Sequence, residues 1–147
     1  MTTIDPYQAG MFKNNPYARK RDILGELVVI LDGRLEERNL HLIAPISRAL
    51  MQGEIHELII TDEENAGPNK KANRIAYLGF FEISQGGVMV SGDNLFVADN
   101  KVGTIAGFDI THMPNHLNIV IYSENRVSGF DQGLTLGTKV RCAHADA

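Results

Sequence analysis

The stretch from Gly92 to Tyr122 constrains the fold more than any other, because strand patterning and turn chemistry coincide in it. Residues Asn94–Ala98 and Lys101–Phe108 form two runs rich in apolar and β-favouring side chains, and Asp99-Asn100 lies between them. Asp and Asn tolerate the positive φ angles that tight hairpin turns require. The stretch therefore predicts a β-hairpin with a two-residue turn.

Two glycines, Gly103 and Gly107, lie inside the second run of this hairpin. A glycine within a strand usually marks a bulge, a bend or a close approach of another backbone. A polar segment, residues 109–116, follows the hairpin, and Leu117–Tyr122 then reads as a buried strand. The sequence thus predicts a polar loop held between two strands, which is where functional side chains tend to gather.

The rest of the chain repeats the pattern of short strands and close turns. A short helix is predicted from Pro45 to Gln52, because proline suits a first helical turn and Gly53 suits the position just past the end. We expect a mainly β fold, a closed or nearly closed antiparallel, Greek-key-like β-barrel of about six to eight strands with one short helix. Further strands are predicted at Glu26–Leu31, Ile55–Thr61, Arg74–Ile83, Val88–Val90 and Leu134–Cys142.

Length and composition fit one globular domain. The chain has 147 residues, with 44% hydrophobic and 22% charged side chains, which is ordinary for a folded protein. Residues 1–22 lack periodicity and are predicted to form an extended N-terminal arm, residues 23–142 the β-barrel domain, and residues 143–147 a tail.

Charge and cysteine content exclude several classes of function. A net charge of −4 argues against nucleic acid as a partner, because phosphate binding needs a basic surface. No run approaches the ~18 apolar residues of a membrane span, so we expect no membrane association. The single cysteine, Cys142, excludes an intramolecular disulfide and a cysteine-rich zinc site. A cytoplasmic location is the expectation.

The polar loop carries the candidate catalytic residues His112, His116 and Asp109. Histidine titrates near neutral pH, and a carboxylate fixes its tautomer, so this set suits general acid–base chemistry. The alternative is that Asp109 only satisfies backbone donors in a tight turn. The neighbouring side chains that are candidates for ligand binding are Thr111, Asn115 and Asn118.

The same three residues are also a candidate site for a divalent metal cofactor. His112 and His116 are four apart, the spacing that binds zinc when both lie on one helix face, but Pro114 between them favours a loop. With Asp109 they supply three ligands and leave one open position.

A second candidate for ligand binding is Asn73-Arg74, which follows a long Gly-Pro loop. Arginine offers a planar fork that matches a carboxylate or phosphate, and Lys70 and Lys71 lie nearby. The alternative is a solvated cluster that balances the acidic run of residues 62–64.

Residues 92–140 resemble the C-terminal half of the glucitol/sorbitol-specific enzyme IIA component of the bacterial phosphotransferase system. The similarity lies in Gly92-Asp93, in Thr104–Gly107, in His116–Ile119 and in Leu136-Gly137. It implies a closed Greek-key barrel. The histidine that this family phosphorylates lies in its N-terminal half, where the present sequence offers only residues 39–42, Asn-Leu-His-Leu.

Three functions follow as hypotheses. The first is binding of a small polar or anionic metabolite at the Asp109–Asn118 loop, with enzymatic turnover left open. The second, implied by the resemblance, is a phosphocarrier in sugar uptake. The third is a non-catalytic homo-oligomeric assembly module, in which the aromatic and apolar residues of the N-terminal arm cross to another subunit.

Overall fold

The structure is a computed structural model that describes residues 16–145, and within this range it contains strands and no helix. No helix in this part of the chain is long and apolar enough to cross a membrane. The strands are β1 (Ile23–Ile30), β2 (Arg34–Leu35), β3 (Leu40–His41), β4 (Ser47–Leu50), β5 (Ile55–Thr61), β6 (Lys71–Ala72), β7 (Ile75–Gln85), β8 (Gly87–Val90), β9 (Asn94–Val97), β10 (Asn100–Asp109), β11 (Asn118–Tyr122) and β12 (Lys139–Ala143).

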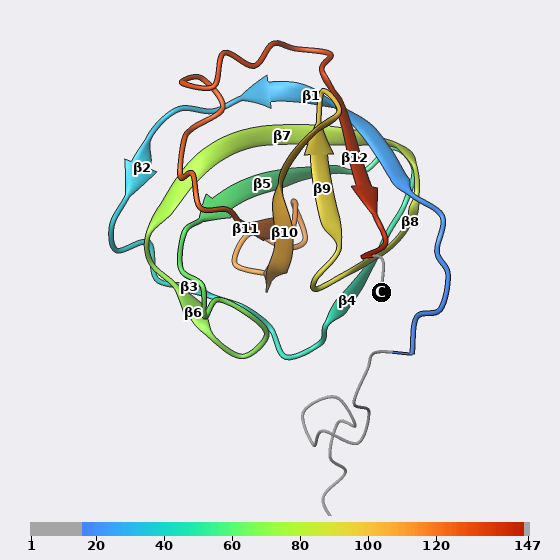
Figure 1. Cartoon of the computed structure of the whole chain (residues 1–147), viewed down its shortest axis with the longest axis horizontal. Coiled ribbons are helices and arrows are strands. Elements are labelled where there is room, and N and C mark those ends of the chain that lie inside the picture. The colour runs from blue at the N-terminus through green and yellow to red at the C-terminus, as the bar shows by residue number, and fades with distance from the viewer. Residues whose placement is uncertain (1–15, 146–147) are drawn as a thin grey trace, which may run out of the picture.

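One large sheet organises the molecule (Figure 1). Its eight strands follow the order β1-β12-β9-β10-β11-β5-β7-β2, and β1 also pairs with β7. The hydrogen bonding therefore closes into a ring, with β2 attached to β7 outside it. Two small antiparallel pairs, β3–β6 and β4–β8, complete the strand pairings of the described residues.

The strand pairings are mostly antiparallel, as predicted, and one pair is parallel. Strand β11 runs parallel to β5, with Asn118 opposite Glu57 and Tyr122 opposite Thr61. A tight turn can join only antiparallel neighbours, and parallel strands need a long connection. Because β5 and β11 are far apart in the sequence, the turn signals that located the strands contained no information about this pairing.

The predicted helix from Pro45 to Gln52 is wrong. Residues Ser47–Leu50 form β4, which pairs antiparallel with β8. A helix of about two turns gains few hydrogen bonds for the cost of its nucleation. β8 satisfies the backbone of this segment instead, and Gly53, at φ 89°, makes the turn toward β5.

The predicted hairpin is confirmed, with its turn one residue earlier than expected. Ala98 and Asp99 occupy the turn at φ 51° and 63°, and Asn100 pairs with Val97. Gly103 and Gly107 both lie at register shifts of β10, as the sequence indicated. A Cβ atom on Gly103 would overlap the carbonyl oxygen of Tyr122, so the close approach of β11 requires glycine there.

Strand β5 is buried on both of its faces. Leu58 and Ile60 belong to the core cluster that contains Phe81 and Phe108. Ile59 belongs to a second cluster, with Leu40, Leu42, Ala72, Ile75, Ala106 and Val120, which the β3–β6 pair covers. Because side chains alternate along a strand, Glu57 lies on the same face as Ile59, outside the main core.

The described part of the predicted arm packs against the sheet. The Tyr17 hydroxyl donates to Ser47 Oγ at 3.1 Å, and Lys20 Nζ pairs with the Asp93 carboxylate. Gln85 Nε2 donates to the carbonyl oxygen of Asp22 at 2.7 Å. Residues 1–15 of the arm and residues 146–147 of the tail lie outside the described residues.

Candidate functional site

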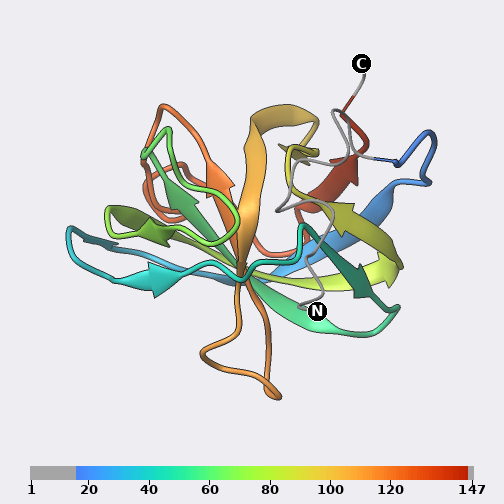
Figure 2. The same ribbon diagram turned by 90° about the horizontal axis from the view of Figure 1, so that it is seen from below.

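The loop between β10 and β11 projects away from the ring of strands (Figure 2, orange). Its base is the register pair Asp109–Asn118. Asp109 Oδ1 accepts hydrogen bonds from the Thr111 backbone N–H at 2.9 Å and from Asn118 Nδ2 at 3.1 Å. Asp109 Oδ2 accepts from the His41 backbone N–H at 3.2 Å. The carboxylate therefore anchors both ends of the loop and ties it to β3.

A single turn of backbone brings the two predicted histidines together. The N–H groups of Asn115 and His116 both donate to the carbonyl oxygen of His112, at 2.9 and 3.3 Å. The four-residue spacing thus places both imidazoles on one side, although the segment is not a helix. The rings stack with centroids 5.1 Å apart and an interplanar angle of 30°.

Glu57, which was not among the predicted site residues, faces His116. Glu57 is only 8% exposed, and its Oε1 lies 3.3 Å from His116 Nε2. The approach lacks the direction of a hydrogen bond, because Nε2 has no such partner. Within Ile55–Thr61 a glutamate at an alternate position looks like a solvent-facing residue. Only the parallel pairing with β11, which places Asn118 opposite Glu57, puts the carboxyl under the loop.

Burial moves the pKa values of Glu57 and His116 toward each other. It raises the pKa of the Glu57 carboxyl, against the lowering influence of His112 and Arg38. It lowers the pKa of the His116 imidazole, and the neighbouring His112 lowers that pKa further, while Asn118 acts in the opposite direction. Both groups are thus shifted toward their neutral forms.

The pKa of Asp109, unlike that of Glu57, is shifted in the direction that favours the charged form. Burial would raise the pKa of its carboxyl, but hydrogen bonds from Thr111, His41 and Asn118 outweigh it, so this pKa lies below its ordinary value. Asp109 is therefore a stable anion that holds the loop. Its contact with Asn118 Nδ2 fixes the amide, whose buried Oδ1 has no hydrogen-bond partner.

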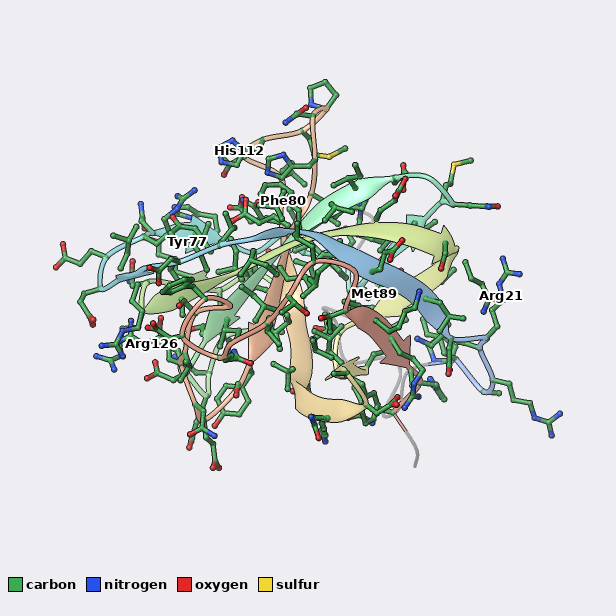
Figure 3. The ribbon with its side chains drawn as sticks, turned by 90° about the horizontal axis from the view of Figure 1, so that it is seen from above. Arg21, Tyr77, Phe80, Met89, His112 and Arg126 are labelled. Atoms are coloured by element: carbon green, nitrogen blue, oxygen red, sulfur yellow. The ribbon has the colours of Figure 1, made fainter. Side chains whose placement is uncertain are left out.

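A cavity of about 320 Å³ opens beside His116. The edge of the Phe80 ring meets the His116 ring, with centroids 4.9 Å apart and planes at 75°, and Figure 3 shows His112 on the loop above Phe80. The Asn115 amide lies 3.0 Å from His116 Nδ1 at the cavity. The lining residues are Gly53, Ile55, Phe80, Asn115 and His116.

The predicted site residues are thus divided between two places. Asp109, Thr111, His112, Asn115, His116 and Asn118 lie together in or beside the projecting loop.

Asn73 and Arg74 lie elsewhere, just before the N-terminal end of β7. Arg74 Nη2 binds Asp62 Oδ2 and Arg74 Nη1 binds Glu36 Oε2, each at 3.0 Å. Asn73 Oδ1 accepts from the Asn39 backbone N–H at 3.0 Å. The chain's own carboxylates therefore occupy the guanidinium fork, and this cluster lies at the opposite end of β5 from Glu57.

Residues 16–145 contain no group of three or more His, Cys, Asp and Glu side chains arranged to hold a metal ion. The stacked arrangement of His112 and His116 agrees with this, because the two rings lie face to face. Asp109 directs its oxygens at hydrogen-bond donors.

No curated protein and no solved structure matches the chain. One family model matches residues 17–143, which cover every strand of the described structure. The chain therefore belongs to a family of unknown function, DUF6917.

Proposed function

We propose that the protein binds a small anionic metabolite in the cavity beside His116, and that His116 takes up a proton when the anion binds. The observation that carries this proposal is the buried Glu57–His116 pair, whose imidazole also lines an accessible cavity. Pairs of titratable groups whose surroundings shift their pKa values are common at functional sites.

The geometry gives the two nitrogens of His116 different roles. Nε2 faces Glu57 inside the protein, and Nδ1 faces Asn115 at the cavity. Asn115 is exposed, so its side chain is free to yield its place to a ligand. A carboxylate that binds at Nδ1 stabilises the imidazolium form of His116, and the Glu57 carboxylate beside Nε2 stabilises it from the other side.

The walls of the cavity indicate the rest of the ligand. Phe80 and Ile55 offer apolar surface, and Ile55 is 44% exposed although it lies within a strand. A volume of about 320 Å³ is at the lower end for small-molecule sites. These features favour a small carboxylate with a flat or branched apolar body.

Benzoate and benzamide provide a matched pair of probes, because they share a ring and differ in charge. We expect benzoate to raise the melting temperature and to shift the ¹⁵N resonances of the His116 imidazole toward those of the charged form. Benzamide should do neither. The benzoate response should weaken as pH rises, because the anion selects protonated His116.

Two variants test whether the response to benzoate comes from binding at His116. His116→Ala should abolish the benzoate response while the protein still unfolds cooperatively. His41→Ala is the control, because the exposed His41 side chain is replaced while its backbone bond to Asp109 remains. The proposal fails if benzoate leaves His116 unshifted at millimolar concentration, or if His116→Ala responds like the wild type.

A further inference from the structure

A second buried histidine, His56, lies on the core face of β5 beside the end of the projecting loop. It is 6% exposed, and the next residue, Glu57, points to the opposite face of the strand. His56 Nδ1 accepts a hydrogen bond from the backbone N–H of Leu117 at 2.9 Å, and Leu117 is fully buried. An imidazole nitrogen accepts a hydrogen bond only while it carries no proton. The contact therefore requires a neutral His56 whose proton is on Nε2.

Glu54 supports this tautomer from the other side of the ring. Glu54 Oε1 lies 3.3 Å from His56 Nε2, and the same oxygen accepts a hydrogen bond from the Met51 backbone N–H at 2.7 Å. A carboxylate that accepts from one ring nitrogen leaves the other nitrogen free to accept. The turn before β5 thus holds the imidazole with Nδ1 directed at Leu117.

The His56–Leu117 contact fixes the point at which the loop returns to the sheet. Leu117 directly follows His116, and β11 begins at the next residue. Both backbone polar groups of Leu117 are bonded to β5, since its carbonyl oxygen accepts from the Glu57 N–H at 3.0 Å. The place of the His116 imidazole against Glu57 and Phe80 therefore depends on the His56–Leu117 contact.

We propose that His56 is a positioning residue for His116 that acts only while its imidazole is neutral, so that a proton taken up from solvent by His56 releases the end of the loop. Protonated Nδ1 is a donor, and it faces the donor N–H of Leu117. The Leu117 N–H then loses its buried acceptor, and this end of the loop separates from β5. The anion site beside His116, the proposed function on which this inference rests, is thereby withdrawn at acid pH.

The charged groups around His56 come from the β4–β5 turn, from β4 and from the loop. Burial lowers the pKa of the His56 imidazole, Glu54 raises it, and His116 and Arg48 lower it. On β7 the register partner of His56 is the uncharged Phe81. Since the pKa in the folded state lies below the ordinary 6.5, which the released imidazole regains, protons favour release as pH falls below 6.5. The released population grows by up to about tenfold for each pH unit until the folded pKa is reached.

The first test combines ¹⁵N NMR of the imidazole with native-state hydrogen exchange of the full chain. At pH 7.5 we expect His56 to carry its proton on Nε2. At pH 5 the Leu117 amide should exchange through a local opening that low urea does not accelerate. After correction for the intrinsic exchange rate, this opening should be at least about threefold more populated at pH 5 than at pH 7.5.

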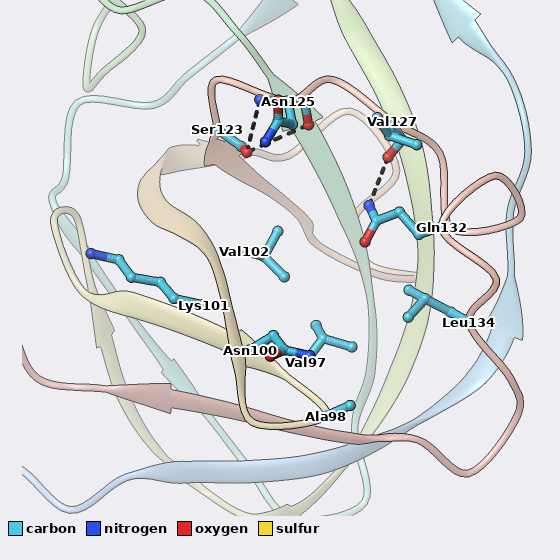
Figure 4. Close-up of a pocket in the computed structure, with 10 residues that line it drawn as sticks. All are labelled: Val97, Ala98, Asn100, Lys101, Val102, Ser123, Asn125, Val127, Gln132 and Leu134. Carbon is cyan, nitrogen blue, oxygen red and sulfur yellow. Dashed lines mark hydrogen bonds between the residues drawn. The ribbon is translucent and has the colours of Figure 1, made fainter.

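Val97 provides the control amide for opening of the whole sheet. It is a buried strand residue in the wall of a cavity of about 390 Å³ (Figure 4), and it pairs with Asn100 at the end of β10 that lies away from the loop. Its exchange should accelerate with urea. A proton on Nδ1 of His56 at pH 7.5 overturns the inference, as does a Leu117 opening that is the same at both pH values. It is also overturned if Leu117 matches Val97 in free energy of opening and in urea dependence at pH 5.

The variant His56→Asn tests whether protonation of the side chain drives the opening. Asparagine offers an amide oxygen near the position of Nδ1, and this oxygen takes up no proton between pH 7.5 and pH 5. Leu117 should therefore be protected to the same degree at both pH values. A pH response that persists in this variant would contradict the proposal.

The variant Glu54→Gln tests the same charge from outside and leaves His56 in place. Glutamine keeps an acceptor at Oε1 and removes the charge that stabilises protonated His56 in the folded state. Leu117 should open about threefold more than in the wild type at pH 5, the scale of one partly exposed ion pair, and should be unchanged at pH 7.5. Glu124→Gln makes the same charge change on an exposed residue beyond the other end of β5 and should change neither value. An equal effect of Glu54→Gln at both pH values would mean that Glu54 is only scaffold, and would overturn the inference.

Hydrogen exchange needs no ligand, so it tests the role of His56 separately from benzoate binding. If both proposals hold, the benzoate response grows as pH falls and His116 gains its proton, and it declines once His56 is protonated. In His56→Asn the response should keep growing down to pH 5. The expected exchange behaviour without any benzoate response would refute the proposed function alone.

Discussion

Replacing Asp109 by alanine should separate the scaffold of the loop from its chemistry. The carboxylate accepts three hydrogen bonds, from the backbone of Thr111, the backbone of His41 and the side chain of Asn118. Asp109 is 2% exposed and Asn118 is fully buried. Alanine removes all three acceptor contacts at once and leaves the Asn118 amide without a partner inside the protein.

The expected loss in the free energy of unfolding depends on whether each hydrogen-bond donor can bind water once the carboxylate is gone. The N–H groups of Thr111 and His41 belong to exposed residues and regain water, so each costs about 1 kcal/mol. The buried Asn118 Nδ2 does not regain water, and an unsatisfied buried donor costs about 1–3 kcal/mol. We expect Asp109→Ala to lower the free energy of unfolding by about 3–5 kcal/mol.

Urea denaturation at pH 7, followed by far-UV circular dichroism, measures this difference. Because the pKa of Asp109 is lowered in the folded state, its stabilisation is present above the ordinary pKa of 3.8 and is lost as pH falls through the folded value. The difference between wild type and variant should therefore shrink at strongly acidic pH. A loss below about 1 kcal/mol at pH 7 would refute the view that Asp109 holds the loop.

Three further predictions concern other buried charges. Burial lowers the pKa of both His56 and His116, so their contribution to stability is full above the ordinary pKa of 6.5 and declines as pH falls through the lower folded values. Replacing both by glutamine should flatten the melting temperature between pH 7 and pH 5, and an unchanged slope would contradict this. Burial raises the pKa of Glu57, so its contribution is present below the ordinary pKa of 4.5 and is lost as pH rises through the folded value. Glu57→Gln should therefore maintain or increase the melting temperature at pH 8 while removing the benzoate response of His116; a large drop in stability would argue for a charged structural pair. Lys20→Met leaves the buried Asp93 without its ammonium partner and should cost about 3–5 kcal/mol in urea denaturation, whereas a near-neutral result would mean that water replaces the lysine.

Local features of the fold were readable from the sequence. The β9–β10 hairpin and the bulges at Gly103 and Gly107 follow from residues that act on their own backbone. The stacking of His112 on His116 also follows from their proximity in the chain, whereas the Asp109 carboxylate binds Thr111, Asn118 and His41 and neither imidazole.

Features that depend on distant partners were not readable. The sequence of β4 resembles that of a short helix, and only its pairing with β8 makes it a strand. The direction of β11 depends on its pairing with β5. Glu57 resembles a surface residue until β11 and the loop cover it. Arg74 resembles a free anion site until Asp62 and Glu36 are seen to occupy it.

The resemblance to the glucitol/sorbitol-specific enzyme IIA component, and with it a phosphocarrier role, stays a prediction. So does homo-oligomerisation through the N-terminal arm, whose residues 1–15 lie outside the described part of the chain.

The position of β12 in the ring has a consequence for biosynthesis. This strand, residues 139–143, bridges β1 and β9, the first and the ninth strand along the chain. During translation β1 emerges early, and one of its edges stays unpaired until β12 has left the ribosome. The other strands of the ring can pair beforehand, but the ring closes only when β12 pairs with β1 and β9. Chaperones that shield an unpaired strand edge should therefore engage nascent chains of this protein soon after β1 has emerged, and release them only after residue 143 has emerged.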